Sequence, residues 1–272
     1  MLIQRCSALP DNFPVTDDMV FLRGQGSLRN EMKKGNIFLC DYKILDGVKA
    51  NLIDGKQQYL MAPLVLLHKT PDDKLMPIAI QLKQTPADDN RIFFPTDSEV
   101  PSFPHLLIPY TRDTLEINFF AYFLISKTGI YPKIAAAGVE GMMTILKRSL
   151  SSMTYSSLCI PDDIAERGVE AVPNFYYRDD GLKLWDIIQR FVQAVLSYYH
   201  RNDTEVQTDS EQQKWILDIF EHGFLSQAGT GIPQSFTTVA DLIKFVTMVI
   251  FTCSGQHSAV NSGQMKPFNL PG

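Results

Sequence analysis

The chain has 272 residues, of which 45% are hydrophobic and 20% charged, and its formal net charge is -5. A chain of this length can bury a sizeable core, as one large domain or two small ones. The acidic balance argues against a nucleic-acid surface. No CxxC pair occurs among the cysteines, and the first residues do not have the pattern of a secretory leader, which predicts free thiols in a reducing compartment, the cytoplasm. The cysteines are Cys6, Cys40, Cys159 and Cys253.

The first third of the chain alternates short apolar runs with turn residues. Asp46-Gly47 and Asp54-Gly55 are typical turn pairs that separate these runs. Short apolar runs bounded by such turns predict β-strands. We therefore expect a small sheet, preceded by an extended arm over residues 1–29. The expected strands cover residues 36–42, 59–67 and 76–82.

The rest of the chain has the apolar spacing of helices. Asp179 and Asp180 precede one of them and are expected to cap its start. The sequence thus predicts a mainly α protein, with strands only in the first third and one candidate boundary near Val100-Pro101. The expected helices cover residues 111–126, 139–150, 161–168, 182–199 and 209–222.

A further long helix is expected to begin near Thr238, where Thr238 and Asp241 resemble a capping box. Between Leu242 and Cys253 the only charged residue is Lys244, so this helix is expected to lie in a core. The apolar run is too short for a membrane span by the usual criterion of about 20 residues.

His257 and Asn261 follow this helix, four residues apart and therefore on one helical face. Two such donors can hold one metal ion, although a buried histidine and asparagine more often only form hydrogen bonds with the groups around them. Ser254-Gly255 is expected to kink the helix just before them. The remaining histidines have no helical partner of ligand type four residues away: His68, His105, His200 and His222.

Several stretches together resemble one family. They occur in the family's order along the chain, and as a set they are specific: GNIFLCDYKILDG (35–47), MPIAIQL (76–82), LLIPYTR (106–112), TYSSLC (154–159), YYRDDG (176–181) and IFTCSGQHSAVN (250–261). On these residues the chain resembles the animal lipoxygenases, most nearly the arachidonate 5-lipoxygenase group.

This resemblance implies a single partial lipoxygenase catalytic domain over residues 1–272, mainly α-helical. Its sheet-containing part would cover about 30–100 and its helical part about 101–264. The family's N-terminal β-sandwich is not expected in this chain. The family reaction uses one non-haem iron to dioxygenate a polyunsaturated fatty acid such as arachidonate with molecular oxygen.

The resemblance also implies roles for individual residues. His257 and Asn261 match two iron ligands of the family. Ala121 matches the small-residue site linked to stereochemistry, while Ile134 and Ala135 match the end of the fatty-acid pocket. No catalytic side chain is assigned.

The chain departs from the family pattern at the other iron ligands. The family's His-x-x-x-x-His helix should lie between residues 98 and 106, where this chain has only Glu99 to His105. We also do not expect the family's C-terminal isoleucine ligand, because the sequence departs from the family pattern after Gln264. Two neutral donors should bind iron weakly, so we expect an inactive, marginally stable chain. The alternative is a non-catalytic lipid-binding or regulatory partner of an intact lipoxygenase.

Overall fold

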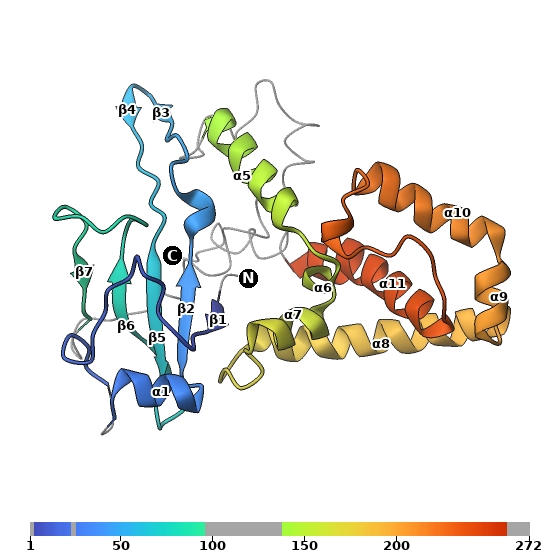
Figure 1. Cartoon of the computed structure of the whole chain (residues 1–272), viewed down its shortest axis with the longest axis horizontal. Helices are drawn as coiled ribbons and strands as arrows, with labels where there is room; N and C mark the ends of the chain where they lie inside the picture. The colour runs from blue at the N-terminus through green and yellow to red at the C-terminus, as the bar shows by residue number, and fades with distance from the viewer. Residues whose placement is uncertain (1–2, 23–25, 96–137, 260–272) are drawn as a thin grey trace, which may run out of the picture. The chain divides into compact units, whose positions relative to one another are not determined.

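The computed structural model describes residues 3–22, 26–95 and 138–259 (Figure 1). The chain divides into two compact units. The first, here called the sheet unit, comprises Met1–Ser151 and Arg167–Asn174, and the second, the helical unit, comprises Ser152–Glu166 and Phe175–Gly272. The predicted fold class, mainly α with a small sheet in the N-terminal part, is confirmed. The prediction of one catalytic domain stays a prediction, because two compact units can belong to one domain.

The sheet unit contains a five-stranded sheet in the order β1-β2-β5-β6-β7, in which every neighbouring pair is antiparallel. The three predicted strands are confirmed as β2, β5 and β6. The edge strands β1 and β7 were not predicted, because they are too short to show the alternation of apolar and polar residues that marks a strand. The strands are β1 (Ile3–Arg5), β2 (Ile37–Asp41), β5 (Leu64–Lys69), β6 (Leu75–Gln81) and β7 (Ile92–Phe93), and β3 (Leu52–Ile53) pairs separately with β4 (Lys56–Gln57).

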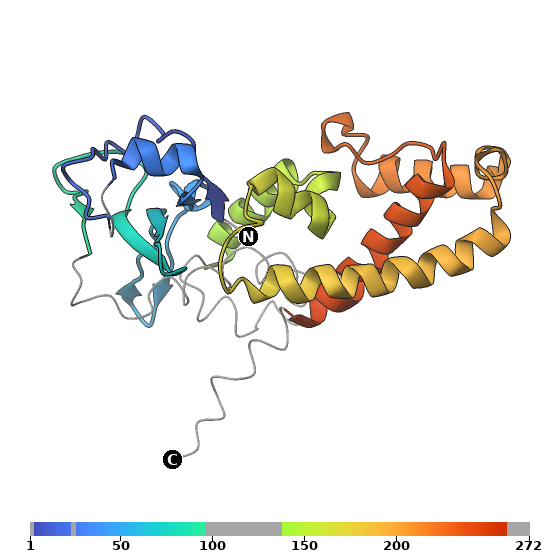
Figure 2. The ribbon, with the colours of Figure 1, turned by 90° about the horizontal axis from the view of Figure 1, so that it is seen from below.

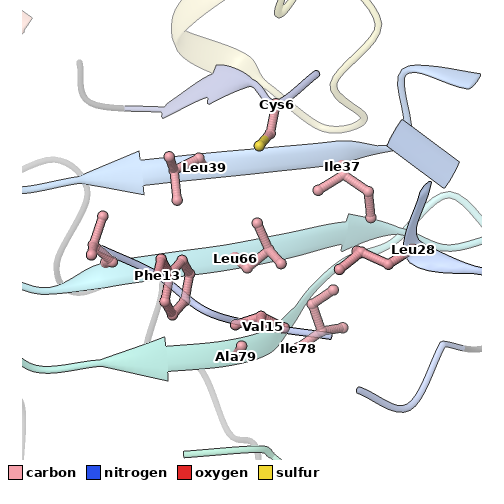
Figure 3. Packing of buried hydrophobic residues seen from close by; sticks show 10 residues of the cluster. Cys6, Phe13, Val15, Leu28, Ile37, Leu39, Leu66, Ile78 and Ala79 are labelled. Carbon is pink, nitrogen blue, oxygen red and sulfur yellow. The ribbon is translucent and has the colours of Figure 1, made fainter. Parts of the chain in front are cut away.

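The core of this unit lies on the central strands. Leu66 of β5 is fully buried and is paired with Leu39 on one side and Ala79 on the other. Phe13 and Val15 of the N-terminal segment pack on the same apolar cluster (Figure 3). The predicted extended arm is therefore part of the core, since it covers apolar side chains that the sheet alone would leave in water.

Helix α1 (Leu28–Lys34) also was not predicted. The Ser27 side chain accepts a hydrogen bond from the backbone N–H of Asn30, and Gly35 ends the helix with a φ of 79°. Both are regular helix-end signals. They were overlooked because the helix is only seven residues long.

A buried carboxylate joins α1 to the sheet. Glu31 is 8% exposed, and its carboxylate accepts hydrogen bonds from Lys34 Nζ at 2.7 Å and Asn36 Nδ2 at 2.7 Å. His68 Nε2 on β5 lies 3.4 Å from the same carboxylate. The hydrogen bond from Lys34 lowers the pKa of Glu31 most, burial opposes it, and Asn36 and His68 lower it further, to about 2.

The last described helix of the sheet unit is α5 (Gly138–Ser152), which confirms the predicted helix 139–150. Its Arg148 donates hydrogen bonds to the carbonyls of Ile44, in η1 (Lys43–Leu45), and of Asp46, at 2.7 and 2.6 Å. The guanidinium thus ties the helix to the segment after β2. The predicted helix 111–126 lies outside the described residues.

The helical unit is built around the long helix α8. The predicted helices 161–168 and 182–199 are confirmed as α7 and α8, and the predicted helix 209–222 is divided into α10 and a π-helical turn, η2. The elements are α6 (Tyr155–Leu158), α7 (Ile160–Arg167, whose last residue belongs to the sheet unit), α8 (Tyr176–Tyr199), α9 (Asp203–Thr208), α10 (Ser210–Asp218), η2 (Ile219–Gly223), η3 (Ala228–Thr230), α11 (Val239–Phe251) and η4 (Thr252–Gln256).

The prediction that Asp179 and Asp180 cap α8 is wrong. The helix begins at Tyr176, and the backbone N–H of Asp179 already donates to the carbonyl of Phe175. Asp179 instead forms an ion pair with Arg178 at 2.7 Å. Carboxylates in the first turn still favour the helix through its dipole, so the residue type fits while the boundary was placed too late.

Helices α8 and α11 run side by side (Figures 1 and 2). The ring of Trp185 on α8 meets Phe251 edge-on, with centroids 5.5 Å apart. A Cβ on Gly181 would lie 2.3 Å from Cδ1 of Ile160, so the missing side chain permits the close approach of α7 to α8. This helix pair positions the turn that follows α11.

Candidate functional site

The candidate site is carried by α11 and the turn that follows it. The Thr238 side chain accepts a hydrogen bond from the backbone N–H of Asp241, which confirms the predicted cap. Phe245 is 1% exposed and packs edge-on against Trp215 and Phe236. The buried residues of α11 are Leu242, Ile243, Phe245, Thr247, Met248 and Phe251, so the predicted core helix is confirmed.

The helix continues through η4 without a break. Val239–Ala259 is 21 residues long with a mean hydropathy of 1.3, which is long and apolar enough to cross a membrane by length and composition alone. The apolar run from Leu242 to Cys253, which we expected to be too short for a span, is thus part of a longer helix that meets this criterion. Core helices of globular proteins meet the same criterion, and α11 packs against α8 in the manner of one.

A half-buried ion pair between Lys244 and Asp162 connects α11 to α7. Lys244 Nζ lies 2.5 Å from a carboxylate oxygen of Asp162 and 5.5 Å from the centroid of the Tyr155 ring. Partial burial lowers the pKa of Lys244, but the hydrogen bond to Asp162 outweighs it and the pKa is raised. Burial raises the pKa of the Cys159 thiol to about 12 and also raises the pKa of Tyr155. These two groups stay protonated at neutral pH, so they act as packing groups and not as nucleophiles.

The predicted kink at Ser254-Gly255 takes the form of a π-helical turn, η4. The Ser254 hydroxyl donates to the carbonyl of Ile250 at 2.5 Å. A Cβ on Gly255 would lie 2.4 Å from Cδ2 of Leu184, and Gln256 Nε2 donates to the Tyr177 hydroxyl at 3.2 Å. Such turns insert one extra residue and re-aim the side chains beyond them, frequently at functional sites.

His257 comes directly after this turn and is exposed. Asn261 lies outside the described residues, as do the three predicted substrate residues Ala121, Ile134 and Ala135. The structure therefore places one of the predicted site residues, and it places that residue where a π-helical turn orients it.

The donors around His257 do not make up an iron site within the described ranges. A mononuclear iron site needs several nitrogen or oxygen donors around one point. Over residues 3–22, 26–95 and 138–259, no group of three metal-ligating histidine, cysteine or carboxylate side chains includes His257. The hydroxyls of Thr247 and Thr252 are buried without a hydrogen-bond partner, but neutral hydroxyls cannot replace a carboxylate or imidazole. No reaction step through iron is assigned to these residues.

A different group of ligand-type side chains was missed from the sequence. Asp218, Glu221 and His222 have ligand atoms within 4.8 Å of one another, and all three are exposed. The statement that His222 has no ligand-type partner four residues away is therefore wrong, since Asp218 holds that position. Exposed carboxylates beside a histidine commonly bind no ion, and nothing else in their surroundings points to one.

Comparison with known proteins identifies the family. Residues 97–269 match the family model described as lipoxygenase. Human polyunsaturated fatty acid lipoxygenase ALOX15B is 40% identical over 312 residues, covering 97% of this chain and 46% of the relative. Mouse polyunsaturated fatty acid lipoxygenase ALOX8 is 42% identical, with the same coverage. The chain spans less than half the length of these relatives.

Solved structures of lipoxygenases are also similar to this chain. A calcium-dependent 11R-lipoxygenase superposes with a TM-score of 0.84 at 33% identity, covering 98% of this chain and 47% of that one. Coral 8R-lipoxygenase gives a TM-score of 0.82 at 29% identity, with 97% and 47% covered. Nearness to the 5-lipoxygenase group in particular stays a prediction. The matches in sequence and structure together show that the chain belongs to the lipoxygenase family.

Proposed function

We propose that this chain is a catalytically incomplete lipoxygenase, which has the family's scaffold for polyunsaturated fatty acids but does not dioxygenate them by itself. The observation that carries the proposal is the interval between Ser98 and Leu106, where the family's His-x-x-x-x-His helix is expected and this chain has only Glu99 to His105. The lipoxygenase family uses non-haem iron, whereas in this chain the proposal assigns only His257 and Asn261 to it.

The alignments support an internal loss of donors. Each extends over more positions than the 272 residues of this chain, 312 for human ALOX15B and 313 for mouse ALOX8, so this chain has gaps relative to both. The short interval Glu99–His105, where the family's His-x-x-x-x-His helix is expected, is our candidate for the largest gap. Loss of two imidazoles would remove most of the binding free energy for iron.

The substrate class follows from the relatives. Two of them are named polyunsaturated fatty acid lipoxygenases, and a further solved lipoxygenase, 28% identical with a TM-score of 0.81, was crystallised with arachidonate. We propose a fatty acid of this kind, with oxygen as the co-substrate in the family reaction. Ala121, Ile134 and Ala135 are proposed contacts of the acyl chain, since all lie inside the matched range 97–269.

Iron content and oxygen uptake test the proposal together. Purified protein, expressed with added ferrous iron, should contain well below one iron per chain and should take up no oxygen with arachidonate. A full-length relative treated in parallel provides the positive control. Stoichiometric iron with hydroperoxide formation would overturn the proposal. A His257→Ala variant should leave the residual iron unchanged if that iron is adventitious.

A second candidate is a non-catalytic partner that binds an intact lipoxygenase in the cytoplasm. It is favoured by the number of large apolar side chains that α8 leaves exposed, among them Ile187 and Phe191. Such a partner would change the activity of a full-length relative when mixed with it. Unchanged activity of that relative over a range of mixing ratios would remove this candidate.

A further inference from the structure

The direction of the His257 side chain depends on the π-helical turn η4. In a regular α-helix the backbone N–H of His257 would donate to the carbonyl of Cys253, four residues back. It donates instead to the carbonyl of Thr252, five residues back, and to that of Ser254. The extra residue rotates every later side chain about the helix axis by roughly 100° relative to an uninterrupted helix. Whatever maintains this turn therefore determines where His257 points.

Contacts within the turn do not account for its geometry. The Ser254 hydroxyl donates to the carbonyl of Ile250 at 2.5 Å. Serine bonds of this kind, to a carbonyl four residues back, bend a helix but also occur in helices without a π-helical turn. Because π-helical turns are rare, contacts from outside the turn are needed to favour it over a regular helix.

Helix α8 supplies contacts to two consecutive residues of η4. Gln256 Nε2 donates a hydrogen bond to the Tyr177 hydroxyl at 3.2 Å. A Cβ on Gly255 would lie 2.4 Å from Cδ2 of Leu184, so the backbone of Gly255 lies directly against that side chain. Tyr177 and Leu184 are seven residues apart, which is two turns of α8, and they therefore share one face of that helix.

The position of α8 is fixed at the start of the turn. The ring of Trp185 meets Phe251, the last residue before η4, with centroids 5.5 Å apart. Gly181 lies against the same ring, since a Cβ built on it would be 3.9 Å from Cζ of Phe251. Tyr177 is therefore held at a defined place beside the turn by packing that does not involve its own hydroxyl.

Of the two contacts with η4, the hydrogen bond is the more selective. Packing on Leu184 requires only that position 255 carries no side chain. The bond to Tyr177 requires the amide of Gln256 to point towards α8, and a rotation of about 100° would carry that amide beyond hydrogen-bond reach. Both side chains are half-buried, so water replaces the bond only in part.

From these contacts we infer that Tyr177 is a positioning residue: through Gln256 it holds η4 in its π-helical form and thereby fixes the direction of His257. The contacts lie wholly within the protein, so Tyr177 has this role whether or not a metal ion binds. The positioning role thus goes beyond the proposed function, which concerns the number of iron ligands. It is measurable in protein treated with a chelator.

Hydrogen exchange of the His257 amide, followed by NMR in the chelator-treated full chain, measures how firmly the turn is held. Tyr177→Phe keeps the ring and removes the acceptor, so this amide should exchange about 2–10-fold faster, the factor that a typical net hydrogen bond provides. Tyr176→Phe removes a hydroxyl from the neighbouring residue, which is 71% exposed, and should leave the rate unchanged. Unchanged exchange in Tyr177→Phe, or an equal rise in both variants, would overturn the positioning role.

A double-mutant cycle separates the Tyr177–Gln256 pair from the other contacts of each residue. Gln256→Leu combined with Tyr177→Phe should raise the exchange rate no further than the more damaging single variant does. Multiplication of the two single effects would show that the residues act independently, and would contradict the assignment.

The imidazole resonances of His257 test its direction. At fixed pH they should shift in Tyr177→Phe and stay in place in Tyr176→Phe, because a rotated ring meets different neighbours, whereas a general loss of stability moves no single histidine. Their assignment comes from their disappearance in His257→Gln. An unmoved His257 signal in Tyr177→Phe would overturn the inference. Stoichiometric iron in the untreated protein would instead refute the proposed function and leave these metal-free results unchanged.

Discussion

The central strand of the sheet unit is covered by nearby chain, whereas the longest helix of the helical unit leaves most of its residues outside the core. In the sheet unit, β5 is buried along almost its whole length, and the N-terminal segment and α1 pack against the apolar cluster of its sheet. In the helical unit, α8 is 24 residues long and buries two of them. An antiparallel sheet with short connections closes its core with nearby chain, but a long helix needs several partners around it.

The two units also differ in the interactions that stabilise them. The sheet unit combines apolar burial with a buried carboxylate network around Glu31, and the helical unit depends on a cluster of aromatic rings around Phe245. Both tryptophans, Trp185 and Trp215, belong to the helical unit. Tryptophan fluorescence therefore reports on that unit alone, which makes the comparison measurable.

The largest expected effect is that of Phe245→Ala. Removing a ring that is 1% exposed, with aromatic neighbours on several sides, should cost about 3–5 kcal/mol and shift the fluorescence-detected unfolding midpoint in urea. Leu66→Ala is the matched change in the sheet unit and should cost about 2–5 kcal/mol. Hydrogen exchange should then show loss of protection in β5 only for Leu66→Ala. Equal loss of protection in both variants would mean that the two units share one cooperative core.

Next in size is the effect of pH through Glu31. Its pKa is about 2 in the folded chain against 4.5 for an ordinary glutamate. Because the folded pKa is depressed, this stabilisation is full above about pH 4.5 and is lost as pH falls towards 2. At 1.36 kcal/mol per pKa unit, the difference between 4.5 and about 2 amounts to about 3 kcal/mol.

Glu31→Gln should therefore lower the free energy of unfolding at pH 7 by about 3 kcal/mol and flatten its pH dependence between about pH 4.5 and 2. Hydrogen exchange of α1 and β5 measures it. Glu211→Gln, which removes an exposed carboxylate from the helical unit, is the control and should change neither. An unaltered pH profile in Glu31→Gln would show that the carboxylate network does not stabilise the sheet unit.

A smaller effect is expected at the start of α11. Thr238→Ala removes the side-chain acceptor for the N–H of Asp241 and should cost about 1 kcal/mol, seen by tryptophan fluorescence. Thr238→Asp keeps an acceptor at the same position and should restore most of the loss. If Ala and Asp behave alike, the cap contributes nothing to the helical unit.

The smallest effect is expected on the open face of α8. Ile187→Gln should change the unfolding free energy of the monomer by less than about 0.5 kcal/mol, because the side chain is 55% exposed. Val192→Ala on the covered face of the same helix should cost about 1–3 kcal/mol. A large loss for Ile187→Gln in dilute protein would show that this side of α8 is already covered within one chain.

Periodicity and turn residues predicted the longer elements, including β2, β5, β6, α5, α7, α8 and α11. These patterns did not predict short elements such as β1 and α1, because a few residues are too few to show a hydrophobic period. The same patterns placed Asp179 and Asp180 before the start of α8, because carboxylates are favoured both at the N-cap and in the first turn of a helix. His257 was identified through its spacing to Asn261, but its exposure was not predicted. Spacing along a helix shows which residues share a face, and it does not show what covers that face.

Gly255 and Leu184 meet at the contact between η4 and α8, and each therefore limits the size of the other. A methyl group at 255 would occupy the place of the Leu184 Cδ2 atom, so Gly255→Ala should be tolerated better together with Leu184→Ala than alone. Leu184 is 37% exposed, so part of its side chain also lies on the outer surface of α8. A larger side chain at position 255 would therefore displace Leu184 at the outer surface of α8. The residues at positions 255 and 184 should vary together among related chains.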